Sequence, residues 1–235
     1  MAQEPIFGLA DTHLHLAAHV AFGGYGIWGA PHARDPTLSD DQALADALAP
    51  CVPAHGRWGA VPSLEGVGRH ATGGYPRFDG WPRHTTMAHQ QAYVDWLRRA
   101  VDGGLRLAVC LAVNNELLGR RMSSLRGQNP AVDDMSAIQR QLRAIESMVD
   151  FVDARCGGLG RGWMEVAYSP ADARRIAGEG RLAVVLGVEI DALGGWHTPH
   201  ELERAAETAG VAPAGLIRQL VQDLYDRGVR HVFPV

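Results

Sequence analysis

The sequence contains no lysine, and all 22 of its basic residues are arginine. A lysine Schiff base, a P-loop lysine and a metal site bridged by a carboxylated lysine are therefore excluded for this chain. The arginines are scattered along the sequence rather than massed, and the net charge is −4. A surface that tracks phosphates is not indicated, so we expect no nucleic-acid partner.

Cysteines and long apolar runs are also scarce. Cys51, Cys110 and Cys156 are widely spaced and form no C-x-x-C pair. This argues against a disulfide framework and a thiolate zinc site, and we expect buried or idle thiols in a reducing compartment. The longest apolar runs, such as 182–188, are far shorter than the roughly 18 residues of a membrane-spanning helix. Residues 1–10 lack the basic start of a signal peptide. We therefore expect a cytoplasmic protein without a membrane span, with export left open.

Apolar runs of strand length alternate with amphipathic segments. Runs at 6–10, 105–113 and 182–190 predict buried strands of a parallel sheet, the first leading into the sequence ADTHLH. Two further strands are predicted at 229–235 and, more weakly, at 163–168, where Ser169 and Pro170 stop the run. Apolar stripes with capping residues predict the following helices: 39–49, from Thr85 or Thr86 to Gly103, from Asp133 or Asp134 to Gly157, from Thr198 onward, and 213–226. This alternation predicts a single α/β domain over residues 1–235.

The long segment 22–82 follows the first strand and is rich in proline, glycine and tryptophan. A segment of this length with little regular structure is usually either disordered or functional, and its tryptophans argue against disorder. Because the loop after a barrel strand emerges on the catalytic face, we expect this insertion to cover a site near the first strand.

Asp11, His13 and His15 lie at the end of the first predicted strand. Alternate side chains of a strand point to the same side, so these three share one face. Two neutral imidazoles so placed can hold one metal ion, with Asp11 orienting one of them. The alternative is a pair of loop histidines without a ligand role.

Glu189 is the one charged residue in the apolar run LAVVLGVEI. An ionised carboxylate at the end of a strand buried on both faces is costly unless it is paired or bound to metal. Glu189 is therefore a candidate metal ligand that can bridge two divalent ions. The alternative is a glutamate that simply reaches solvent.

Asn114 and Asn115 end the apolar run LRLAVCLAV. They are weaker candidates for hydrogen bonds to a substrate carbonyl, because asparagine is also a common turn residue.

Three segments resemble a known family: ADTHLH, RLAVVLGVEIDAL and LYDRGVRHVFPV. They are similar to metal-dependent hydrolases of the amidohydrolase superfamily, in particular the membrane (renal) dipeptidase-like branch. The resemblance implies a TIM barrel, two divalent ions, most commonly zinc, bridged by Glu189, and hydrolysis of a small amide or dipeptide by a metal-activated water. The family usually has H-x-D on its first strand, so the ligand role of His15 follows the H-x-H form of the wider superfamily.

Two alternatives to a dipeptidase-like hydrolase stay open. The segments DTHLHL and GVEID also resemble a TatD-like metal-dependent deoxyribonuclease, and a barrel relic without catalysis would use the same fold without metal. Because about 250 residues usually build eight barrel strands and this sequence provides four or five, we expect an incomplete N-terminal part of the barrel. Further ligands would then follow Val235, and residues 1–235 alone would be inactive. A homo-oligomer is left open.

Overall fold

The computed structural model describes residues 5–24, 26–48, 89–125 and 131–234. Its elements follow the chain in this order: β1 (Leu9–Leu14), η1 (Ala18–Val20), η2 (Phe22–Gly24), α1 (Asp40–Ala47), α4 (Val94–Asp102), β2 (Leu105–Asn114), α5 (Glu116–Leu125), α6 (Asp134–Arg155), β3 (Met164–Val166), α7 (Pro170–Gly178), β4 (Leu182–Ile190), η3 (Leu193–Gly195), α8 (Pro199–Ala209), α9 (Pro213–Asp226) and β5 (His231–Pro234).

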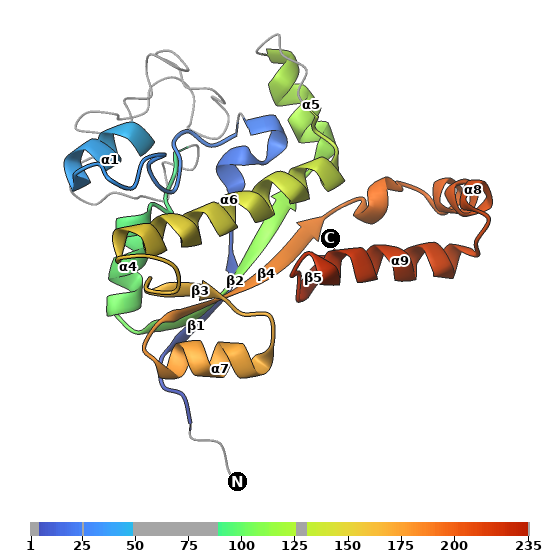
Figure 1. Cartoon of the computed structure of the whole chain (residues 1–235). Coiled ribbons are helices and arrows are strands. Elements are labelled where there is room, and N and C mark those ends of the chain that lie inside the picture. The colour runs from blue at the N-terminus through green and yellow to red at the C-terminus, as the bar shows by residue number, and fades with distance from the viewer. Residues whose placement is uncertain (1–4, 25, 49–88, 126–130, 235) are drawn as a thin grey trace.

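A parallel sheet of five strands organises the described residues (Figure 1). The strands lie in the order β1, β2, β4, β3, and β5 pairs with the carboxyl half of the same β4 edge that carries β3. β2 and β4 run in continuous register from the pair Leu107 and Ala183 to the pair Asn114 and Ile190. The predicted α/β class with a parallel sheet is confirmed.

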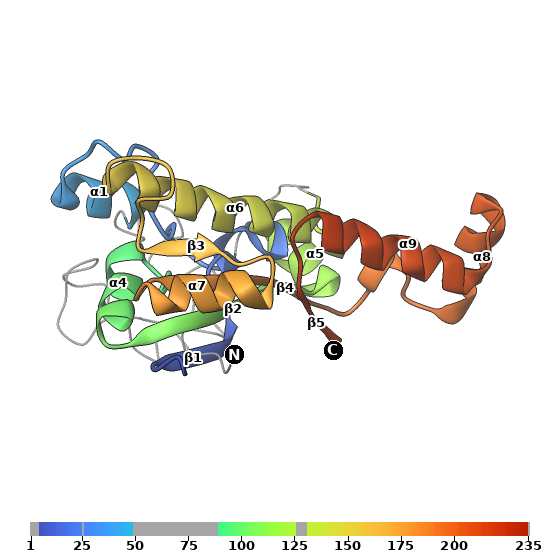
Figure 2. The same cartoon turned by 60° about the horizontal axis from the view of Figure 1, so that its bottom comes forward.

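Helices cover the two faces of the sheet unequally (Figures 1 and 2). The main core lies between α4 and α6 and the even-numbered residues of the central strands, among them Ala108, Cys110 and Val184. On the opposite face, α7 packs Ile176 against Ala183 in a much smaller cluster. Most of the apolar burial therefore lies on the α6 side, while the odd-numbered side chains of the strands face α7.

The prediction that the first strand is buried is wrong. β1 begins at Leu9 rather than at residue 6, and Phe7 and Leu9 are 83% and 65% exposed. The reason is its place in the sheet: within the described residues β1 is an edge strand that pairs with β2 alone. By contrast, β2 and β4 are buried along most of their length, as their continuous apolar runs predict.

The capping residues predicted the first residues of several helices correctly, but the start of one helix was predicted wrongly and two helices were missed. Ser39, Asp133 and Thr198 cap α1, α6 and α8 as predicted, and α9 has the predicted bounds. α4 starts at Val94 rather than near Thr85, because the amide of Gln90 donates to the carbonyl of Trp28 in an extended segment. Helices α5 and α7 were not predicted. Ser169 and Pro170 begin α7 as its cap and first residue instead of merely ending a strand.

The 22–82 insertion falls within the described residues only up to residue 48. There the amide of Phe22 donates to Asn114 Oδ1 at 2.9 Å, and Arg155 of α6 donates to the carbonyl of Leu38 at 2.8 Å. This part lies on the α6 side of the sheet. Residues 49–88 lie outside the described residues, so covering of the site by the insertion stays a prediction.

A hollow of about 800 Å³ lies on the α7 side of the sheet. Leu9, Leu107 and Val185 of the strands and Ala173 and Ala177 of α7 contribute to its lining. It lies toward the amino ends of β2 and β4, away from their carboxyl ends.

No helix within the described residues combines the length and the apolar character that crossing a membrane demands.

Candidate metal centre

The end of β1 is irregular, and this irregularity sets the position of His13. Asp11 pairs with Ala108 and Leu14 with Cys110, so three steps along β1 match two along β2, which is a β-bulge. Within the bulge the amide of His13 donates to Asp11 Oδ1 at 3.0 Å. Asp11 was predicted to orient an imidazole. In the structure its carboxylate instead accepts a hydrogen bond from the main-chain amide of His13, because the bulge brings that amide close to the carboxylate.

His15 follows the last paired residue of β1, where the two strands separate. Its Nδ1 lies 3.2 Å from the carbonyl oxygen of Leu111 on β2. A carbonyl only accepts, so Nδ1 carries the proton and the lone pair of neutral His15 is on Nε2. Further along this edge Gln141 of α6 accepts from the amide of Val113 at 3.0 Å and donates to its carbonyl at 2.8 Å. The side chains of His15 and Gln141 thus bond to main-chain groups of β2 at the point where β1 turns away and no longer pairs with that strand.

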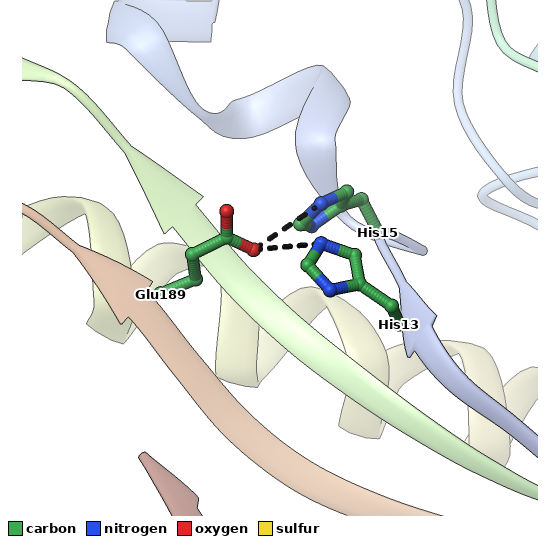
Figure 3. Close-up of side chains that lie close together, drawn as sticks. All are labelled: His13, His15 and Glu189. Atoms are coloured by element: carbon green, nitrogen blue, oxygen red, sulfur yellow. Dashed lines mark ion pairs between the residues drawn. The ribbon is translucent and has the colours of Figure 1, made fainter. Parts of the chain in front are cut away.

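Glu189 faces both histidines from β4, across the intervening strand β2 (Figure 3). Its Oε2 lies 3.0 Å from His13 Nε2 and 3.5 Å from His15 Nε2. The Glu189 side chain is 17% exposed, against 47% for His13 and 31% for His15. Oε2 itself is buried, and neither imidazole approaches it with hydrogen-bond geometry, so it has no hydrogen-bond partner.

An unsatisfied buried carboxylate oxygen is unusual and requires an explanation. Two ligands that each lie about 2.0–2.1 Å from a tetrahedral ion stand about 3.3 Å apart. The two nitrogen-to-oxygen distances, 3.0 and 3.5 Å, bracket that separation. Two imidazoles and one carboxylate are also the donor set of a catalytic zinc site with one open position. These three residues therefore fit a divalent metal ion.

The floor beneath the three side chains is formed by a close approach that glycine permits. Leu111 lies opposite Gly187 in the sheet, and His231 of β5 flanks Gly187 on the other side. A Cβ at position 187 would lie 2.6 Å from Leu111 Cδ2 and 3.2 Å from His231 Cβ. The sequence signal was present, since a glycine inside a strand often marks a close approach, but this residue was not among the predicted site residues.

A phenylalanine that the sequence analysis also missed lies against His13. The ring centroids of Phe233 and His13 are 5.5 Å apart with an interplanar angle of 83°, and those of His13 and His15 are 5.0 Å apart at 86°. Phe233 pairs in register with Glu189 on the neighbouring strand.

The two asparagines have different surroundings from each other. Asn114 is 3% exposed; its Nδ2 donates to the carbonyl of Val132 at 2.9 Å and to Asp134 Oδ1 at 2.7 Å. Because both of its N–H groups are bonded within the protein, Asn114 ties the sheet to α6 instead of presenting a donor to substrate. Asp134 in turn accepts from the amide of Ala192 at 2.9 Å, which links the end of β4 to the same network.

Asn115 lies at the surface beyond the end of β2. Its Oδ1 accepts from the amide of Leu118 at 2.8 Å in the first turn of α5, and its Nδ2 donates to Asp191. A contact of Asn115 with substrate stays a prediction.

Other histidines and the cysteines lie apart from the three candidate ligands. His19 and His32 are largely buried: burial, followed by the nearby His32, lowers the pKa of His19 to about 4, and burial lowers the pKa of His32. Cys110 is buried, which raises its thiol pKa, whereas Cys156 is exposed. Cys51 lies outside the described residues.

Within the described parts of the chain, His13, His15 and Glu189 form the one group of three or more potential metal ligands whose donor atoms all lie within 4.8 Å of one another. The structure thus brings together the three residues predicted as ligands. A second metal ion needs further donors and stays a prediction. No protein-family model, curated protein or solved structure matches the chain.

Proposed function

We propose that this chain belongs to a metal-dependent hydrolase in which His13, His15 and Glu189 hold a divalent metal ion. The observation that carries this proposal is the buried Glu189 Oε2, which has no hydrogen-bond partner and lies 3.0 and 3.5 Å from two imidazole nitrogens. A cation at this point would satisfy a carboxylate oxygen that is otherwise costly to bury.

The location of the three residues supports a hydrolase of the TIM-barrel type. Parallel α/β folds place their active sites at the carboxyl ends of the strands, and His13, His15 and Glu189 all lie there. β1, β2, β4 and β5 run side by side and parallel, as barrel strands do, although the short strand β3 lies on the far edge of β4 and not between β2 and β4. The barrel architecture is part of this proposal.

Each side chain has a distinct task in this proposal. The carbonyl of Leu111 accepts from Nδ1 of His15, so the lone pair of the neutral ring is on Nε2, the nitrogen that faces Glu189. Glu189 supplies the negative charge, and its low exposure limits competition by water for the carboxylate. When bound, the metal ion would polarise the scissile carbonyl and lower the pKa of water to about 7. His13, the most exposed of the three side chains, borders the side open to solvent.

We propose a small amide or a dipeptide as the substrate, on the basis of the three segments that resemble membrane dipeptidases. The TatD-like deoxyribonuclease also needs metal but cleaves phosphodiesters, and a catalytically inert relic needs none. Substrate and metal assays together therefore separate the three possibilities.

Metal binding is the primary test, because it does not require the remaining parts of a barrel. The purified chain is stripped with a chelator, titrated with Zn²⁺, Mn²⁺, Co²⁺ or Fe²⁺, and analysed for bound metal. We expect stoichiometric binding that His13→Ala, His15→Ala and Glu189→Gln each weaken by more than about 100-fold, above the loss typical of residues that only orient ligands.

His200→Ala serves as the matched control for loss of a histidine. His200 lies on α8 with its side chain 74% exposed, so this variant should bind metal like the wild type. Absence of binding by the wild type, or equal binding by all variants, would refute the site. A panel of dipeptides, acyl amides and a DNA oligonucleotide then tests the reaction class with the metal-loaded protein.

A further inference from the structure

The two imidazoles of the proposed metal site differ in what holds their rings. His15 is fixed by the hydrogen bond between Nδ1 and the carbonyl of Leu111. Among the described residues, the ring of His13 lies against Glu189 Oε2 and the rings of His15 and Phe233. His13 is also the most exposed of the three side chains, at 47%. Within the part of the chain that the structure describes, its orientation therefore depends on the facing carboxylate and on ring packing, without a hydrogen bond like the one that fixes His15.

Phe233 is well placed to provide that packing. It lies on β5 directly beside Glu189, and its ring meets that of His13 nearly at a right angle with the centroids 5.5 Å apart. This is the edge-to-face geometry that aromatic pairs favour. At the same time Phe233 is 42% exposed, so burial alone does not account for a large apolar ring at this position.

We propose that Phe233 is a positioning residue that holds the His13 imidazole with Nε2 toward Glu189. This inference rests on the proposed metal site. Without the Phe233 ring, the imidazole of His13 gains rotational freedom, and metal binding must then restrict that freedom again. The contact thus performs for His13 the task that the Leu111 carbonyl performs for His15. Residues that orient a metal ligand typically contribute a factor of 10–100 to metal affinity.

The test compares three variants on β5 by metal titration. We expect Phe233→Ala to weaken Zn²⁺ and Co²⁺ binding about tenfold, and Phe233→Tyr, which keeps the ring, to stay within about twofold of the wild type. Val232→Ala is the matched control, because Val232 is the adjacent residue of the same strand and is equally exposed at 42%. It should leave the affinity unchanged.

A double-mutant cycle and a spectroscopic signature separate positioning from a general loss of structure. In a His13→Ala background, Phe233→Ala should add no further loss of affinity, since its effect passes through His13. The visible absorption spectrum of bound Co²⁺ should change in Phe233→Ala and return in Phe233→Tyr. Wild-type affinity in Phe233→Ala, or an equal loss in Val232→Ala, would overturn the inference.

A measurement on the metal-free protein distinguishes failure of this inference from failure of the proposed function. The ring protons of His13 should carry a ring-current shift in the NMR spectrum that Phe233→Ala removes and Phe233→Tyr restores. If the wild type binds no metal while this shift is present, the metal site is wrong and the ring contact is right. If metal binds but the shift is absent, the metal site holds and the role of Phe233 is wrong.

Discussion

On the face of the sheet that packs against α7, the carboxyl ends of the strands differ from the amino ends in the hydrogen bonding of their polar groups. At the carboxyl end, Glu189 Oε2 is buried without a hydrogen bond and two imidazoles face it. At the amino end lies a hollow of about 800 Å³ in which Arg106 donates to the carbonyls of Val101 and Leu105. Arg230, which also lines the hollow, donates to the carbonyl of Tyr168 at 2.7 Å.

The hollow and the three candidate metal ligands thus lie at different ends of this face. The partly exposed guanidinium groups of Arg106 and Arg230 at the amino end already donate to carbonyl groups within the protein. At the carboxyl end, by contrast, the buried Glu189 Oε2 has no hydrogen bond and faces two imidazole nitrogens. The proposed metal site therefore lies at the carboxyl end, and the following predictions test this contrast between the two ends.

The largest expected effect is on stability with and without metal. At pH 8, a metal ion at 100 times its dissociation constant should raise the free energy of unfolding by about 2.7 kcal/mol, and a chelator should remove this gain. Glu189→Met should lose the gain entirely. Its metal-free form should be about 1–3 kcal/mol more stable than the metal-free wild type, because the unsatisfied oxygen is gone.

Denaturant unfolding of both proteins, with and without chelator, measures these values. Arg174→Gln is the control, since it changes an exposed charged residue at the amino end of the same face. It should keep the metal-dependent gain. A metal-free Glu189→Met variant less stable than the metal-free wild type would contradict the contrast between the two ends.

The next effect is acid sensitivity near the carboxyl end. His19 lies on η1, a few residues after His15, and its pKa is lowered to about 4 by burial and by His32. The folded state therefore holds His19 neutral while the unfolded state binds a proton below about pH 6.5. Stability should fall as the pH decreases from about 6.5 to about 4, by about 2 kcal/mol from this residue, because its partial exposure reduces the full effect of the pKa shift.

The measurement is the free energy of unfolding at a series of pH values between 7 and 4. His19→Leu, which cannot titrate, should flatten this dependence, whereas the exposed His200→Ala should not. An unchanged slope in His19→Leu would mean that His19 does not cause the acid sensitivity.

Gly187→Ala, at the floor of the site, should produce a smaller loss in the free energy of unfolding. The added methyl group would lie 2.6 Å from Leu111 Cδ2, so Leu111 must move, and overpacking of this kind costs about 1–3 kcal/mol. Because the carbonyl of Leu111 holds His15, metal affinity should fall as well. Thermal unfolding and metal titration check the two effects, and unchanged values in both would show that Leu111 adapts without moving its main chain.

Much of the candidate site at the carboxyl ends of the strands was predictable, because the signals for its residues are local in the sequence. Glu189 is a single charge in an apolar run, and the spacing of His13 and His15 places both on one side of a strand. The bulge before Leu14 was not predictable, because it arises from pairing with β2. Gln141 likewise sits within α6, and its task at the edge of β2 follows from tertiary packing alone.

The elements around the amino end of this face, and the pairing of β5, were predicted less well, for a related physical reason. Ser169 and Pro170 favour both the end of a strand and the start of a helix, and only the second interpretation gives α7. Apolar residues at 6–10 predict burial, but burial depends on which strands flank them, and β1 is an edge strand. Pairing partners such as Phe233 beside Glu189 depend on the order of strands, which one sequence does not encode locally.

The smallest effect on stability is expected from a substitution that fills the hollow at the amino end. Ala173 of α7 lines it and is partly buried, so Ala173→Leu adds apolar surface that can pack against Leu107 and Val185 without displacing them. We expect a gain of up to about 1 kcal/mol in the free energy of unfolding, from burial of roughly one methylene equivalent. Metal affinity should stay within twofold of the wild type, because the hollow contributes no ligand. Thermal unfolding and metal titration of the same variant measure both quantities. A stabilised variant that loses metal would show that the two ends of the sheet are coupled, and the hollow would then have to be counted as part of the site.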